Sequence, residues 1–123
     1  MKTSPRLTTL AVLAFGALTG CYYDVETELY PGGDCSAITP GYTSHVEALI
    51  AEQCAGCHAG SAPSGGLSLE YYGQIRDAAL SGAIEDRISR SAGDPLLMPP
   101  NGPLNACDIE AFVTWVADGA PEN

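Results

Sequence analysis

Apolar residues recur at helical spacing in several parts of the chain, and no segment shows a strand pattern of comparable strength. The clearest pattern follows Asn105, a good N-cap residue, and ends near Gly119, a residue type that commonly terminates helices. Asp108 and Glu110 lie in its first turn, where the helix dipole favours negative charge. The pattern predicts a final helix whose apolar inner face consists of Ile109, Phe112, Val113 and Val116, with Trp115 beside them.

An earlier helix is predicted to begin at Ser44, because Ser44-His45-Val46-Glu47 has the spacing of a capping box. Val46, Leu49 and Ile50 then recur on one face, and the helix leads directly to Cys54. Two shorter helices are predicted near 70–80 and 84–89, and the Gly- and Pro-rich stretches 60–66 and 93–103 are predicted as loops. Together these elements predict an all-α domain of about three to four helices.

The first twenty residues have the layout of an export signal, with basic residues at positions 2 and 6 and an apolar run over 7–19. A membrane span needs about 20 apolar residues, so this run is too short for one. Leu18-Thr19-Gly20-Cys21 resembles the lipobox of bacterial lipoproteins, whose cysteine becomes the lipidated first residue. We therefore predict a lipoprotein signal peptide over 1–20 and lipidation of Cys21. The alternative is an ordinary signal peptide followed by a leftover cysteine.

Residues 21–42 combine acidic side chains with Tyr, Pro and Gly and show no sustained period, which predicts an acidic tether after Cys21. The remaining residues, 43–123, are predicted to form one small domain. A domain of this size buries barely enough apolar area to offset the conformational entropy of ordering the chain. Such domains commonly recruit a disulfide, a metal or a cofactor.

The chain is strongly acidic, with 15 Asp and Glu against 5 Lys and Arg and a formal net charge of −10. Removal of the signal would leave only Arg76, Arg87 and Arg90 as basic residues. Such a surface repels phosphate backbones and anionic headgroups, so nucleic-acid binding is not expected. The expected partners are proteins with basic docking patches. The alternative is that the acidity only keeps an exported protein soluble.

Cys54-Ala55-Gly56-Cys57-His58 is the pattern of c-type haem attachment, in which two thiols add to the haem vinyl groups and the adjacent imidazole ligates the iron. Two residues between the thiols let one turn of chain reach both vinyls. A thioredoxin-type redox pair is an alternative, but it would lie near a βαβ pattern. A zinc site is another, and Cys35, Cys107 or His45 would have to supply its further ligands.

Met98 is the candidate for the second axial ligand, because no other methionine remains after removal of the signal. It precedes Pro99 and Pro100 in a stretch too rich in Pro and Gly for a helix. Prolines restrict the backbone on the ligand's C-terminal side, and a thioether raises the potential of the iron relative to a second imidazole. The alternative is that Met98 fills a gap in the core.

Three motifs in order resemble the single-haem cytochrome c family, especially its short exported bacterial domains. They are Gly65-Gly66-Leu67-Ser68-Leu69, Met98-Pro99-Pro100 and the stretch from Trp115 to Pro121, within a resemblance that covers roughly 44–121. The resemblance implies an all-α cytochrome c fold in which helices and loops wrap one covalent haem. It also implies that Cys54 and Cys57 attach the haem and that His58 and Met98 ligate its iron.

The function expected from this resemblance is single-electron transfer on one haem c, without enzymatic activity. The expected location is the periplasmic side or the cell surface, with the membrane contacted only through a lipid anchor. The alternative is a haem peroxidase or gas sensor in which Met98 is a labile ligand. Cys35 and Cys107 have no role in this scheme, and in an oxidising compartment they are candidates for a disulfide between the tether and the last helix. Two free thiols or an intermolecular bridge are the alternatives.

Overall fold

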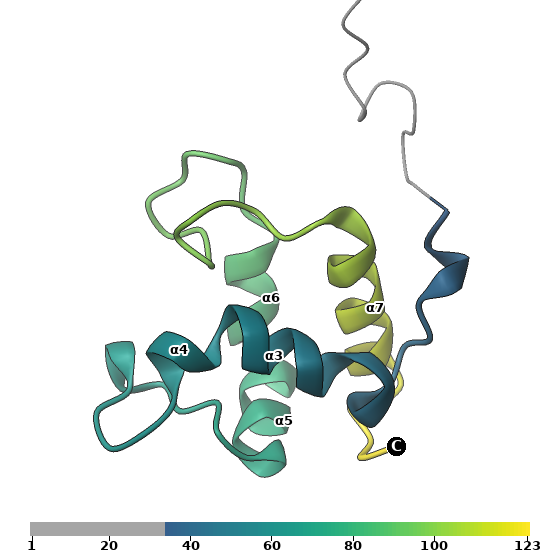
Figure 1. The fold of residues 1–123 in the computed structure, drawn as a ribbon, viewed down its shortest axis with the longest axis horizontal. Coiled ribbons are helices and arrows are strands. Elements are labelled where there is room, and N and C mark those ends of the chain that lie inside the picture. The colour runs from purple at the N-terminus through teal and green to yellow at the C-terminus, as the bar shows by residue number, and fades with distance from the viewer. Residues whose placement is uncertain (1–33) are drawn as a thin grey trace, which may run out of the picture. The chain divides into compact units, whose positions relative to one another are not determined.

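The structure is a computed structural model that describes residues 34–123. The predicted signal peptide, Cys21 and most of the predicted tether lie outside the described residues. The described residues form helices joined by loops, with no strand among them (Figure 1). The prediction of an all-α domain is therefore confirmed for this part of the chain. None of the helices within 34–123 is long and apolar enough to cross a membrane.

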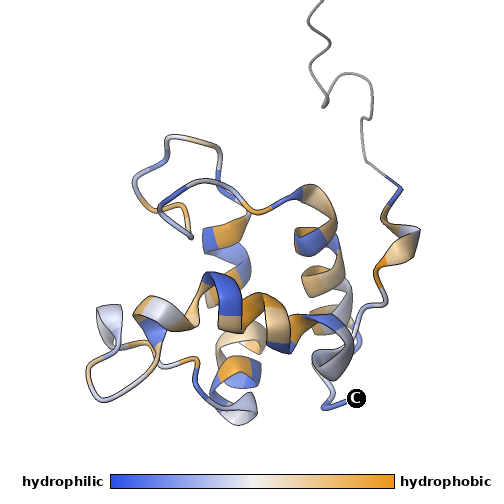
Figure 2. Cartoon of the chain, viewed as in Figure 1, coloured by the Kyte–Doolittle hydropathy of each residue, from blue (hydrophilic) through white to orange (hydrophobic). Residues whose placement is uncertain are grey.

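Within residues 34–123, five α-helices follow one another, together with three short turns of other helix types. The α-helices are α3 (Glu47–Gln53), α4 (Ala55–His58), α5 (Tyr72–Leu80), α6 (Ala83–Ile88) and α7 (Ala106–Ala117). The short turns are 3-10 turns at Cys35–Ala37 and Ser64–Gly66 and a π-helical turn at Tyr42–Val46. Figure 2 shows hydrophobic and hydrophilic residues on each of α3, α5 and α6, as expected of amphipathic helices.

The ends of α7 agree with the prediction, and its inner face agrees in part. The side chain of Asn105 accepts a hydrogen bond from the backbone N–H of Asp108 at 2.9 Å, as an N-cap does. Gly119, two residues past the helix, has a φ of +90°. Phe112 and Trp115 are buried, together with Ala111, whereas the predicted Ile109, Val113 and Val116 are half-buried, and Ile109 and Val116 pack against the core. The Nε1–H of Trp115 donates to the carbonyl of Pro121 at 2.8 Å.

The predicted capping box at Ser44 is wrong, because the helical chain already begins at Tyr42. The Ser44 hydroxyl donates to the carbonyl of Thr39 at 2.9 Å instead of capping a helix. Asn123 takes the capping role from the other end of the domain. Its Oδ1 accepts the N–H of Tyr42 at 3.0 Å and its backbone oxygen accepts the N–H of Thr43 at 2.8 Å.

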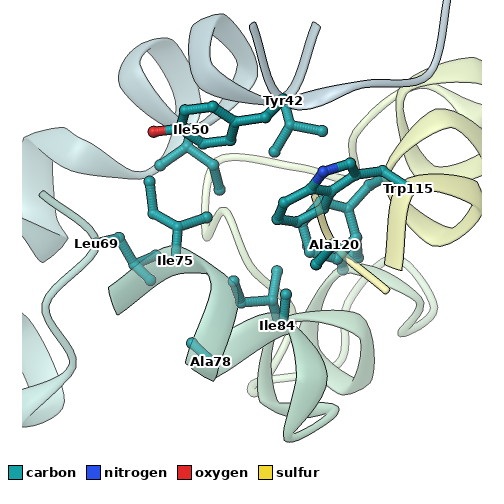
Figure 3. Packing of buried hydrophobic residues seen from close by; sticks show 12 residues of the cluster. Tyr42, Ile50, Leu69, Ile75, Ala78, Ile84, Trp115 and Ala120 are labelled. Atoms are coloured by element: carbon teal, nitrogen blue, oxygen red, sulfur yellow. The ribbon is translucent and has the colours of Figure 1, made fainter. Parts of the chain in front are cut away.

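The hydrophobic core is formed by side chains from the Tyr42–Val46 turn, from α3, α5, α6 and α7, and from Ala120 near the C-terminus (Figure 3). Val46, Phe112 and Trp115 are its largest fully buried side chains. Tyr42 packs edge-on against Tyr72, with ring centroids 4.8 Å apart, and its centroid lies 6.0 Å from that of Trp115. The cluster consists of Tyr42, Val46, Ile50, Leu69, Ile75, Ala78, Ala79, Ile84, Ile88, Phe112, Trp115 and Ala120.

The segment before Tyr42 is attached to this core. Cys35 and Cys107 form a disulfide with their Cα atoms 5.2 Å apart, which ties the segment to the first turn of α7. Residues 34–123 belong to one compact unit, and Tyr42 is buried within it. The last part of the predicted tether therefore belongs to the folded unit, because the bonded cysteine and the buried tyrosine hold it there.

Candidate functional site

Cys54, Cys57 and His58 lie on one turn of chain at the junction of α3 and α4. Cys54 interrupts the helix with φ −121° and ψ −43°, and its carbonyl accepts the N–H groups of both Cys57 and His58, at 3.1 and 3.0 Å. The two cysteines are three residues apart, a spacing at which side chains on a helical turn are neighbours. These two hydrogen bonds fold the segment that carries both thiols and the imidazole into a single helical turn.

The two thiols have different surroundings. Cys54 is half-buried and packs against the hydrophobic core, whereas Cys57 is exposed, and neither is in a disulfide. Burial raises the pKa of the Cys54 thiol. A raised pKa keeps this sulfur as a neutral thiol, whereas reactive redox cysteines have a lowered pKa.

The imidazole of His58 is oriented by a backbone carbonyl. Its Nδ1 lies 3.2 Å from the carbonyl oxygen of Leu67, nine residues further along the chain. A carbonyl oxygen can only accept, so in the neutral imidazole this contact requires the proton on Nδ1 and leaves the lone pair on Nε2. Metal-ligating histidines commonly donate their second ring nitrogen to a carbonyl in this way. The carbonyl of Leu67 therefore orients the imidazole of His58 through Nδ1.

The loop from Gly65 to Leu69 makes this contact possible. Gly65 and Gly66 have φ values of +64° and +71°, a region in which side chains other than that of glycine are strained. The chain then returns to His58, whose carbonyl oxygen accepts the N–H of Leu69 at 2.6 Å. Leu69 is itself buried in the core. The loop thus holds both the ring and the backbone of His58.

Gln74, in the first turn of α5, braces the end of this loop and was missed by the sequence analysis. Its Oε1 accepts the hydroxyl of Ser68 at 3.0 Å and the backbone N–H groups of Glu70 and Tyr71 at 3.2 and 3.1 Å. Gln74 is at the third position of α5, where a capping box has Glu or Gln, but the N-cap is Tyr71 and not Ser or Thr, so the sequence lacked the usual signature.

Met98 lies in the non-helical stretch predicted for it, between α6 and α7. Its side chain is half-buried, and its backbone N–H donates to the carbonyl of Arg87 in α6 at 3.2 Å. The backbone of Met98 is therefore attached to α6.

Two cavities adjoin this loop. One, of about 320 Å³, is lined by residues from Ala92 to Pro103, and they include Leu97 and Pro100. The other, of about 360 Å³, lies between Glu52 and Gln53 at the end of α3 and the stretch from Pro99 to Asp108. Their linings include the neighbours of Cys54 and Met98 but neither residue itself.

The residues that a zinc site would have needed are engaged elsewhere. Cys35 and Cys107 are bonded to each other. The Nε2 atom of His45 lies 3.0 Å from Oδ1 of Asp108, which links the first helical turn to α7. Within 34–123, no group of three or more His, Cys, Asp and Glu side chains is arranged to hold a metal ion. The helical surroundings of Cys54 and Cys57 also differ from the βαβ unit of thioredoxin-type pairs.

Comparison with known proteins does not identify the chain. No protein family, curated protein or solved structure matches it. The site is therefore interpreted from its own residues and geometry.

Proposed function

We propose that this protein is a single-haem c-type cytochrome that transfers electrons. The observation that carries the proposal is the hydrogen bond between Nδ1 of His58 and the carbonyl oxygen of Leu67. This bond leaves Nε2 to ligate iron, on the same turn as two thiols at the spacing of haem attachment. The donor set and its arrangement suit a covalent haem.

Cys54 and Cys57 would hold the haem through thioether bonds. Cys54 lies against the apolar core and Cys57 lies at the surface, so the pair extends from the interior to the exterior of the domain. The raised pKa of Cys54 is consistent with a sulfur in apolar surroundings, where a thioether is well accommodated.

Met98 would supply the second axial ligand from the loop between α6 and α7. Haem c supplies reversible one-electron chemistry when bound, and thioether ligation favours its reduced state. The hydrogen bond from Met98 to Arg87 keeps the ligand's backbone attached to a helix. With both His58 and Met98 as ligands, the iron would have no open position for a substrate, which favours electron transfer over enzymatic activity.

The proposed architecture is the cytochrome c fold, with one haem among the helices and loops. The π-helical turn that leads into α3 contacts α7, so the helical segment before Cys54 packs against the last helix. The acidic composition favours redox partners with basic docking patches. An anchor on Cys21 would keep the domain at a membrane on the periplasmic side or at the cell surface.

The test is the optical spectrum of the exported protein in the oxidised and the dithionite-reduced state. We expect haem that stays with the protein in acidic acetone, and a weak long-wavelength band from sulfur-to-iron bonding in the oxidised state. Cys54→Ala with Cys57→Ala should abolish covalent attachment. Met98→Ala should keep the covalent haem and lose the band.

Two other outcomes would overturn the proposal. Covalent haem without the band in the unmodified protein would favour the peroxidase or gas-sensor alternative, in which the second axial position is open. Absence of haem from the exported protein would leave Cys54 and Cys57 as a thiol pair.

A further inference from the structure

Arg90 connects α6 to the loop that carries Met98. It lies two residues past the end of α6, and its Nη2 donates to both carboxylate oxygens of Asp86 at 3.0 and 3.1 Å. Its Nη1 donates to Oδ2 of Asp94 at 3.1 Å. One planar guanidinium therefore joins a helical carboxylate to a loop carboxylate through charge-assisted hydrogen bonds.

Asp94 also hydrogen-bonds to Leu96 and Leu97, the two residues just before Met98. Its Oδ1 accepts the backbone N–H of Leu96 at 2.7 Å, and its carbonyl oxygen accepts the N–H of Leu97 at 3.0 Å. Leu97 is buried. Asp94 thus folds the chain into a turn that ends at Leu97, the residue before Met98.

A second bond closes the loop at its base. The N–H of Met98 donates to the carbonyl of Arg87, which lies three residues before Arg90. The segment from Arg87 to Met98 is therefore closed at its ends by a backbone bond and braced in its middle by Arg90 and Asp94.

Arg76 offers a comparison, because it lies on α5 and has no such role. Its nearest carboxylate oxygen, on Asp77, is 3.9 Å away, and 42% of its side chain is exposed, against 27% for Arg90. The two arginines carry the same charge and differ in the contacts that they make.

We propose that Arg90 is a positioning residue for Met98, which it holds in place as an axial ligand through Asp94 and the loop between them. The inference rests on the proposed function, since it assigns Arg90 to the ligand loop of a haem site. Without the brace, the loop samples conformations in which the thioether is withdrawn, and an external ligand then competes for the iron more successfully.

The experiment compares the holoprotein with its Arg90→Gln and Arg76→Gln variants, with imidazole as the competing ligand of the oxidised haem. The ion pairs of Arg90 are partly exposed, so Arg90→Gln should raise the apparent affinity for imidazole roughly three- to fivefold. It should also weaken the sulfur-to-iron band. Arg76→Gln should leave both measurements within about twofold of the unmodified protein.

The same pair of variants in a Met98→Ala background separates positioning from a general effect of charge or folding. With no thioether to withdraw, Arg90→Gln should no longer change the affinity for imidazole. The inference would be overturned if Arg90→Gln raised the affinity for imidazole equally with Met98 present and with Met98→Ala. It would also be overturned if Arg90→Gln and Arg76→Gln changed that affinity equally when Met98 is present. Asp94→Asn should reproduce the effect of Arg90→Gln from the other side of the ion pair.

Failure of this inference differs from failure of the proposed function. If haem is bound and Met98→Ala removes the band, the cytochrome proposal stands, whatever Arg90 does. If Met98→Ala changes neither the band nor the affinity for imidazole, Met98 is not a ligand and the proposed function itself is overturned.

Discussion

Nδ1 of His58 lies 3.2 Å from the carbonyl oxygen of Leu67, and this contact depends on a loop of two left-handed glycines. The ring belongs to a helical turn and the acceptor to the loop that follows. Since the acceptor is a backbone carbonyl, the conformation of the loop selects the tautomer that the neutral ring needs for this contact, with the proton on Nδ1. The orientation of the imidazole therefore depends on the backbone conformation of Gly65 and Gly66, which precede the acceptor Leu67.

Gly66→Ala should destabilise the domain. Gly66 has a φ of +71°, and a residue with a Cβ in that region costs about 1–2 kcal/mol. Urea unfolding of the variant should show a lower midpoint. Gly73→Ala is the matched control, because Gly73 lies in α5 with no atom within 4 Å of an added Cβ. Alanine is the better helix former there, so equal or higher stability is expected, and a loss equal to that of Gly66→Ala would contradict the prediction.

Replacing Cys35 and Cys107 together by serine should lower the free energy of unfolding by about 4 kcal/mol. The disulfide spans 72 residues, and removing it lets the unfolded chain regain the entropy of a long closed loop. Guanidinium unfolding of the variant and of the unmodified protein, both without reductant, measures the difference. Indistinguishable midpoints would show that the bond does not constrain the unfolded chain.

Tyr72→Phe should cost about 1 kcal/mol of stability. The hydroxyl of Tyr72 donates to the carbonyl of Ala120 at 2.8 Å, and Ala120 is fully buried, so the variant leaves that carbonyl without this donor. The neighbouring Tyr71 is 65% exposed, so Tyr71→Phe should change the stability by less than about 0.5 kcal/mol. Thermal unfolding of the two variants side by side checks the difference, and equal losses would argue against a role for the hydroxyl of Tyr72.

Asp94 should make part of the stability depend on pH. The backbone N–H of Leu96 and, less strongly, Arg90 hold the pKa of Asp94 below its ordinary value of 3.8. A carboxylate with a lowered pKa stabilises the folded state above its unfolded pKa, and that contribution disappears as the pH falls through the folded pKa. Unfolding measured at several pH values should show Asp94→Asn less stable than the unmodified protein near neutrality and equal to it in strong acid. A difference that stays constant down to strong acid would contradict this assignment.

The neighbourhood of Cys54, Cys57 and His58 was determined by the sequence alone, since residues three and four apart meet on any helical turn. The start of α7 was likewise predictable, because an Asn cap and an acidic first turn act within a few residues. Helical periodicity was sufficient to predict an all-α domain.

Only the tertiary structure decided which partners meet across long separations. The cap at Tyr42 comes from Asn123, which the sequence did not indicate. The sequence named Cys35 and Cys107 as candidates for a disulfide, and the structure decided for the bond against two free thiols. On α7, the predicted face packs against the core, but Phe112 and Trp115 are more deeply buried than Ile109 and Val116. Local propensity does not predict such contacts, because each depends on how helices and loops that are distant in the chain pack against one another.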